Sequence, residues 1–150
     1  MNSHKNLHAQ PCPVARSVDL IGDHWSLLIV RDAFDGVRRF SDFQRRLGVA
    51  RNILSDRLRR LSDAGVLTMQ PVADGGAYQE YVLTEQGEDL FPVVVALRQW
   101  GERHLFASDE PHSELVDKTT GKPLRSMRPR GEDGRVLTPG ETEVRKLVQG

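Results

Sequence analysis

FSDFQRRLGVARNILSDRLRRLSDAG, residues 40–65, contains two amphipathic helical patterns separated by a glycine turn. The first pattern covers about 41–47, and its apolar residues Phe40, Phe43 and Leu47 share one face. The second covers about 51–64, and its leucines recur at helical spacing: Leu54, Leu58 and Leu61. Two short helices joined by a glycine-containing turn predict a helix-turn-helix.

The flanking segments extend this unit to a winged helix. Two further helices are predicted upstream, over about 13–21 and 24–35, with Asp23 as the N-cap of the second. Downstream, β-type patterns over 66–71 and 78–84 surround a glycine-containing turn. Thr84 then caps a long amphipathic helix to about Phe106, which Pro92 should kink or divide. The predicted fold is mainly α with a small β-hairpin wing (α+β), followed by a C-terminal dimerisation helix.

Composition divides the chain into three segments. Residues 1–11 have little to bury and predict a flexible arm, whereas 12–107 predict the winged-helix and dimerisation domain. Residues 108–150 are a cysteine-free appendage, rich in glycine, proline and charge. An internal echo, TGKPL at 120–124 against DGRVL at 133–137, favours a small β/irregular appendage of two turn-centred β units. A disordered tail is the alternative.

The charges are segregated although the net charge is zero. Between Arg38 and Arg60, eight arginines stand against two aspartates, a local balance of +6. Between Thr84 and Asp117, eight acids stand against two arginines, a balance of −6. A solvated helical face would normally mix both signs, whereas a concentrated arginine segment is typical of a phosphate-binding surface.

The helix over 51–64 is the one expected to enter the major groove. With its leucines inward, at about 100° per residue, its N-terminal polar residues lie near the base edges. Arg59 could pair bidentately with guanine and Asn52 with adenine, while the arginines ahead of the helix suit phosphate contacts. The predicted DNA-binding residues are Arg38, Arg39, Ser41, Arg51, Asn52, Ser55, Asp56, Arg59 and Arg60.

At this point the chain resembles the HxlR family of winged helix-turn-helix regulators, which is related to the MarR type. The resemblance covers roughly residues 12–105 and rests on these strings: CPVAR (12–16), IGDHWSLLI (21–29), RFSDF (39–43), LSDRLRRL (54–61), GVL (65–67), YVLTEQG (81–87) and WG (100–101). It implies a homodimer, built from the first helix and the long C-terminal helix, that binds pseudo-palindromic operators in double-stranded DNA and usually represses transcription.

Two features depart from the family pattern. Ala50 stands at the cap position of the recognition helix, where a hydroxyl is common. The predicted wing tip at 74–77 has no lysine or arginine, which argues against a basic wing in the minor groove.

A signal has two predicted points of entry. The resemblance implies that Cys12, ahead of the first helix, senses oxidants or electrophiles; a helix N-terminus favours a thiolate, and an inert interface cysteine is the alternative. Four aromatic residues are candidates for a small-molecule effector pocket, with a plain core or interface role as the alternative: Trp25, Phe91, Trp100 and Phe106.

Other classes of function have less support. A winged helix used for protein–protein assembly, without sequence-specific DNA binding, needs no arginine-rich recognition face. No phosphate loop, nucleophile elbow or metal motif indicates an enzyme, a metal site or a cofactor. One cysteine, no visible signal peptide and no membrane-length apolar run make the cytoplasm the expected compartment.

The long helix also favours self-association. By helical spacing it presents a set of apolar residues that one small winged helix cannot cover: Leu90, Val94, Leu97, Trp100 and Leu105. An isologous two-fold contact is the usual way to bury such a face.

Overall fold

The computed structural model describes residues 6–72, 76 and 78–147. The chain divides into two compact units, Met1–Val94 and Val95–Gly150. The division falls within α6 (Phe91–His104), upstream of the boundary after residue 107 that composition indicates. The predicted wing tip, apart from Gly76, and residues 1–5 of the predicted arm lie outside the described residues. In the part of the chain that the structure describes, no helix has the length and apolar character needed to cross a bilayer.

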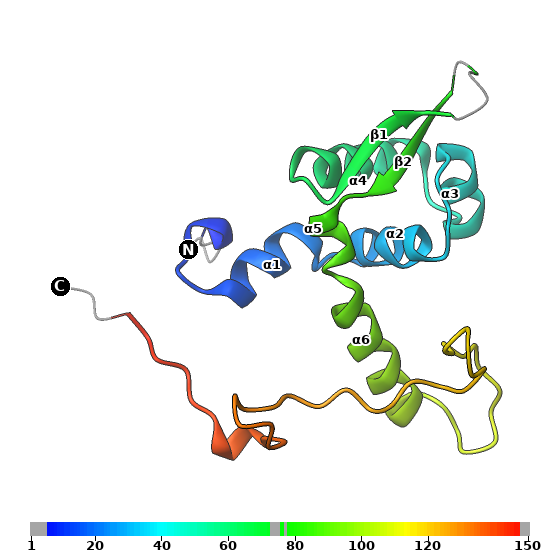
Figure 1. The fold of residues 1–150 in the computed structure, drawn as a ribbon. Coiled ribbons are helices and arrows are strands. Elements are labelled where there is room, and N and C mark those ends of the chain that lie inside the picture. The colour runs from blue at the N-terminus through cyan, green and yellow to red at the C-terminus, as the bar shows by residue number, and fades with distance from the viewer. Residues whose placement is uncertain (1–5, 73–75, 77, 148–150) are drawn as a thin grey trace. The chain divides into compact units, whose positions relative to one another are not determined.

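The helical part of the first unit ahead of the wing (Figure 1) consists of α1 (Pro13–Ile21), α2 (His24–Phe34), α3 (Phe40–Leu47) and α4 (Arg51–Asp63). A 3-10 turn, η1 (Leu7–Ala9), precedes and contacts α1. The predicted cap of α2 is confirmed, since the Asp23 carboxylate accepts the Ser26 N–H at 3.1 Å.

Glycines end the helices of the helix-turn-helix. Gly48 follows α3 with φ of +63°, and Gly65 lies just past α4 with φ of +86°. Glycine adopts this left-handed conformation at little cost, so the chain turns sharply at both points. The predicted glycine turn between the two helices is confirmed at Gly48.

The wing is an antiparallel pair, β1 (Leu67–Pro71) with β2 (Gln79–Leu83), in which Leu67 faces Leu83. β1 begins one residue later than predicted, and β2 leaves out Tyr78 and Thr84 at its two ends, although the Thr84 N–H still donates to the Val66 carbonyl at 3.1 Å. The Val66 N–H donates to the Leu61 carbonyl at 2.9 Å, and the Thr84 hydroxyl accepts the Gly87 N–H at 3.0 Å.

The core of the first unit joins these elements. The three leucines of α4, predicted to face inward, have no exposed surface, and Phe43 of α3 is equally buried. Ile29 and Val30 of α2 and Val66 before β1 belong to the same cluster. α4 contacts both α2 and β1, so the recognition helix rests on the centre of the unit.

The long helix predicted over 84–106 is divided. Thr84 caps a single turn, α5 (Glu85–Glu88), and α6 begins afresh at Phe91. Pro92 has no N–H to continue the helix from α5, but proline is tolerated in the first turn of a new helix, which is where it lies in α6. Leu90 and Val94 pack against the core of the first unit, so they do not belong to the free apolar face that helical spacing predicted.

The second unit combines the rest of α6 with the appendage. Two isolated β-bridges, Val116 with Pro123 and Arg130 with Val136, flank turns at Gly121 and Gly134, whose φ angles are +70° and +86°. These are the two turn-centred units that the echo predicted.

A side chain of α6 pairs with the backbone of the appendage. The Gln99 amide donates to the Arg125 carbonyl at 2.9 Å and accepts the Met127 N–H at 2.7 Å. One glutamine thus bonds to the extended chain as a neighbouring strand would.

Candidate nucleic-acid interface

The outer face of α4 is polar and solvent-exposed. Burial of its leucines turns Asn52, Ser55 and Arg59 outward, and the Arg59 side chain is 69% exposed. Ala50 is the N-cap, and no side chain caps the first turn of the helix, as its residue type predicted.

A cleft of about 680 Å³ lies between the start of the helix-turn-helix and the wing. Its lining includes the predicted DNA-binding residues Arg39, Ser41 and Arg51, which come from α3, α4 and the residue before α3. The Arg39 guanidinium lies 5.9 Å from the ring centroid of Tyr78, and that of Arg51 lies 5.0 Å from the ring of Phe40. Cation–π contacts of this kind orient a guanidinium without neutralising its charge.

Arg39 and Arg51 differ from the other arginines of the basic segment. In the described part of the chain, the guanidinium groups of these two have a ring contact but no hydrogen bond or ion pair. The other six have anionic or carbonyl partners: Arg38, Arg45, Arg46, Arg57, Arg59 and Arg60. The charge that is free to bind an external anion is therefore concentrated at the cleft.

Arg38, two residues before α3, joins the helical part of the unit to the wing. The Tyr81 N–H donates to the Arg38 carbonyl at 2.8 Å, and the Arg38 guanidinium lies 3.4 Å from the Glu80 carboxylate. Arg38 is exposed, but its guanidinium is partly neutralised by the ion pair with Glu80.

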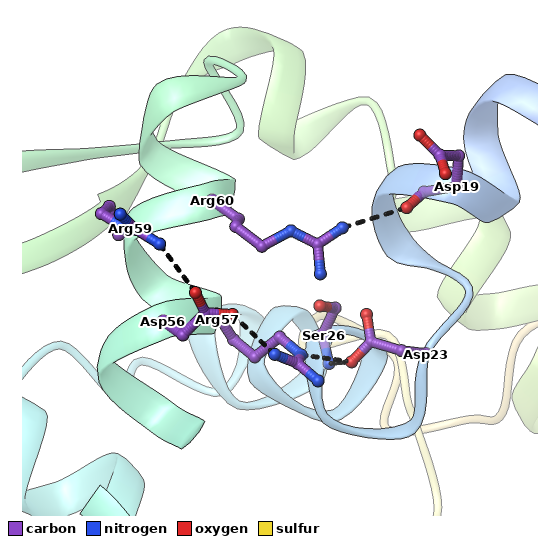
Figure 2. A network of polar contacts seen from close by, with 7 residues as sticks. All are labelled: Asp19, Asp23, Ser26, Asp56, Arg57, Arg59 and Arg60. Atoms are coloured by element: carbon purple, nitrogen blue, oxygen red, sulfur yellow. Dashed lines mark hydrogen bonds and ion pairs between the residues drawn. The ribbon is translucent and has the colours of Figure 1, made fainter. Parts of the chain in front are cut away.

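A chain of ion pairs crosses α4 (Figure 2). Asp56 accepts from Arg59 and from Arg57, each at 2.7 Å, and Arg57 also donates to Asp23 at 2.9 Å. The Arg59 and Arg57 hydrogen bonds lower the pKa of Asp56. Burial alone would raise the pKa of Asp23, but hydrogen bonds from Ser26 and Arg57 outweigh it and lower that pKa. The Asp23 contact in turn raises the pKa of Arg57. Both aspartates are thus held as carboxylates.

Arg60 extends to the other side of α4 (Figure 2). Its guanidinium donates to the Asp19 carbonyl of α1 at 3.2 Å. Arg57 and Arg60 therefore join the recognition helix to α2 and to α1.

A second pair of elements is fixed by a buried carboxylate. Asp32 of α2 has no exposed surface, and its Oδ1 lies 3.3 Å from Arg46 of α3 and 2.9 Å from Arg31. The Arg46 pair joins α3 to α2, whereas Arg31 neutralises the same carboxylate from within α2.

Three contributors to the interface were not foreseen from sequence. Tyr78, Gln79 and Tyr81 of the wing line the cleft, and Tyr78 is 72% exposed. A tyrosine near a cluster of arginines is a usable signal, because aromatic rings and guanidinium groups stack. The anchoring role of Arg57 gives no such signal, because its partner Asp23 is 34 residues away in the sequence.

The candidate sensor lies at the start of α1. Cys12 is its N-cap, is half-buried, and its Sγ accepts the Ala15 N–H at 3.4 Å. One N–H of the first turn of α1 therefore points toward this sulfur.

The four candidate pocket residues have separate surroundings. Trp25 packs against the core of the first unit, and Phe91 lies 5.3 Å from the Phe34 ring and lines a cavity of about 590 Å³. In the second unit, Trp100 stacks with His104 and Phe106 with His112, at 5.2 and 4.9 Å.

This architecture matches a known family of regulators. The model of the HxlR-like helix-turn-helix family matches residues 20–109. The chain belongs to the HxlR family. Among curated HxlR-like relatives, HTH-type transcriptional regulators of Mycobacterium bovis and Mycobacterium tuberculosis are 43% identical over 109 residues, which is 73% of this chain and 69% of theirs.

Solved structures agree with the HxlR assignment. PA1607, a candidate transcription factor, is 48% identical with a TM-score of 0.89, over 95% of this chain and 99% of that one. The redox regulator HypR, in its oxidised form, is 31% identical with a TM-score of 0.58, over 64% of this chain and all of HypR. The predicted winged-helix fold is confirmed, and this HxlR-family chain is a DNA-binding transcriptional regulator and not an enzyme.

Proposed function

We propose that the chain is a homodimeric repressor that places α4 in the major groove of a pseudo-palindromic operator and binds the DNA backbone at the Arg39–Arg51 cleft. The observation that carries this proposal is the pair of guanidinium groups at the cleft, held by rings and lacking an ionic partner among the described residues. Phosphate is the anion that a DNA-binding face must neutralise.

Base reading is assigned to the exposed face of α4. Arg59 offers a guanidinium to guanine, Asn52 a side-chain amide to adenine, and Ser55 a hydroxyl to either. All three are exposed, as a groove-facing residue must be. Arg38 and Arg60, at the edges of this face, are assigned to phosphates of the DNA backbone. Each would replace part of its present contact, with Glu80 or with the Asp19 carbonyl, by a contact to phosphate.

Self-association is supported by apolar side chains that the described chain leaves uncovered. On α6, Leu97 is 51% and Trp100 53% exposed, and on α1 Val14 and Val18 are 70% and 52% exposed. Two copies related by a two-fold axis would cover such surface and present two recognition helices to two half-sites.

The signal is assigned to Cys12. A thiol that accepts a helix N–H is placed to react as the thiolate, and the similarity to the redox regulator HypR supports an oxidant or electrophile as the trigger. A small apolar effector in the cavity lined by Phe91 is the second candidate. As a repressor of chromosomal genes, the protein would act in the cytoplasm.

The test is to isolate and sequence the genomic DNA fragments that the full-length protein retains. We expect a shared motif with two-fold symmetry, and half-site centres about 10 base pairs apart or a multiple of this. Retention without any shared motif would contradict sequence-specific repression, and a single asymmetric half-site would contradict the homodimer.

A further inference from the structure

Arg59 is the charged residue among the three that we assign to base reading, its side chain is 69% exposed, and one contact orients it. Its Nη2 donates to Oδ1 of Asp56 at 2.7 Å, one helical turn away. A solvent-exposed pair at this spacing is weak when both side chains are free to move. The pair can therefore orient Arg59 only if the Asp56 side chain is itself fixed.

Asp56 is held from the other side. Its second oxygen, Oδ2, accepts from Nη1 of Arg57 at 2.7 Å, and Arg57 donates through Nε to Asp23. The Arg57 side chain is only 25% exposed. Asp23 is itself fixed, because its carboxylate caps α2 through the Ser26 N–H. A relay of ion pairs thus runs from Arg59 to the start of the neighbouring helix (Figure 2).

The arrangement limits what Asp56 can do by itself. Each of its oxygens already accepts from one arginine, so the carboxylate is not presented as a free acceptor for cytosine N4. Arg59, in contrast, donates one of its five N–H groups to Asp56, and the others remain available to a guanine edge. The base contact therefore belongs to Arg59.

We propose that Asp56 is a positioning residue, which holds the Arg59 guanidinium in the orientation that sets the base preference of α4 and is itself held through Arg57 at the N-cap of α2. This inference rests on the proposed function, because it takes Arg59 as a base-reading residue. Asp56 acts on sequence preference without contacting a base.

The test is selection from random duplex DNA with the full-length protein and its Asp56→Ala, Arg59→Ala and double variants. Arg59→Ala should lower discrimination at one operator position per half-site by about 5- to 150-fold, the range of a bidentate guanine contact. Asp56→Ala should relax the same position, and the double variant should add nothing to Arg59→Ala. A residue that served only the fold would weaken binding to all sequences alike.

Two further variants keep the test decisive. Asp63→Ala removes an exposed carboxylate from the end of the same helix and should leave the motif unchanged. If Asp56→Ala does not fold, Asp56→Asn keeps the shape, loses the charge, and should relax the same position.

Besides uniform weakening of all sequences by Asp56→Ala, two results would overturn the inference, and they are distinguishable. If Asp56→Ala changes a different position, or if the two effects add, Asp56 reads a base itself while Arg59 remains a reader. If Arg59→Ala leaves the motif unchanged, the assignment of Arg59 in the proposed function is wrong, and the inference is overturned with it.

Discussion

Arg39 and Arg51 are the two cleft arginines that we assign to the DNA backbone. Each guanidinium rests on an aromatic ring, which removes side-chain freedom but leaves the charge unneutralised. Binding then costs less ordering entropy than it would for a free arginine. The neighbouring Arg45 is paired with Asp42 and lacks this property.

The salt dependence of DNA binding tests this difference. In Arg39→Ala/Arg51→Ala, the slope of log K against log salt should become shallower by about 1.8, because each lost phosphate contact removes about 0.9. Affinity for all duplexes should fall together. The matched control is Arg135→Ala, which removes an exposed arginine of the appendage that pairs with Asp133. An unchanged slope in the double variant would remove the cleft from the DNA surface.

The proposed sensor role of Cys12 is also a property of a single residue. Alkylation of the wild-type protein with a small maleimide should lower operator affinity at least tenfold, because a group added at the cap of α1 disturbs a helix that α4 contacts through Arg60. Cys12→Ser should bind the operator and ignore the reagent. Gel shifts with and without pretreatment measure both. A Cys12→Ser protein that still responds would show that the reactive site is elsewhere.

At the scale of elements, charged side chains join the helices of the first unit to one another. Asp23 does two things, since it caps α2 and binds Arg57 of α4. Its pKa is lowered in the folded chain. A carboxyl group with a lowered folded pKa stabilises the fold above its unfolded pKa, and that contribution is lost as the pH falls through the folded value.

Denaturant unfolding of Asp23 variants separates the two roles. Asp23→Ala should lower the free energy of unfolding at pH 7 by about 1 kcal/mol or more, since it loses the cap. Asp23→Asn keeps a capping oxygen and loses only the charge. The difference between the wild type and Asp23→Asn should therefore shrink below about pH 3.9, the ordinary aspartate value. A difference that is the same at pH 7 and pH 2.5 would contradict the ion-pair role.

The helices were predictable from sequence because their signals are local. Asp23, Gly48 and Gly65 mark helix ends by side-chain chemistry and backbone freedom within a few residues. The predicted wing strands were one residue too long at Val66, Tyr78 and Thr84. The Val66 N–H bonds back to Leu61 of α4, and the Thr84 hydroxyl caps α5, which the alternating pattern alone does not reveal. The partners of the arginines could not be predicted, since Arg57 and Asp23 meet only after α2 and α4 pack.

At the scale of the whole molecule, the exposed apolar side chains of α1 and α6 argue for a second copy. Light scattering at micromolar protein should give twice the chain mass of 16.9 kDa. Leu97→Lys, which places a charge on the exposed side of α6, should shift the mass toward the monomer and weaken operator binding. Val144→Lys, at an 80% exposed position of the appendage, should change neither. A wild-type protein of single chain mass would contradict the two-half-site operator.

The Gln99 bridge has a consequence for proteolysis. A serine protease binds its substrate as an extended strand and needs the main-chain groups around the cleavage site. Gln99 already occupies two such groups, the Arg125 carbonyl and the Met127 N–H. Limited trypsin digestion should therefore cut Gln99→Ala after Arg125 faster than the wild type, while the cut after Arg135 proceeds equally in both. Cleavage after Arg125 should thus be controlled by one side chain, which occupies the main-chain groups that the protease has to bind.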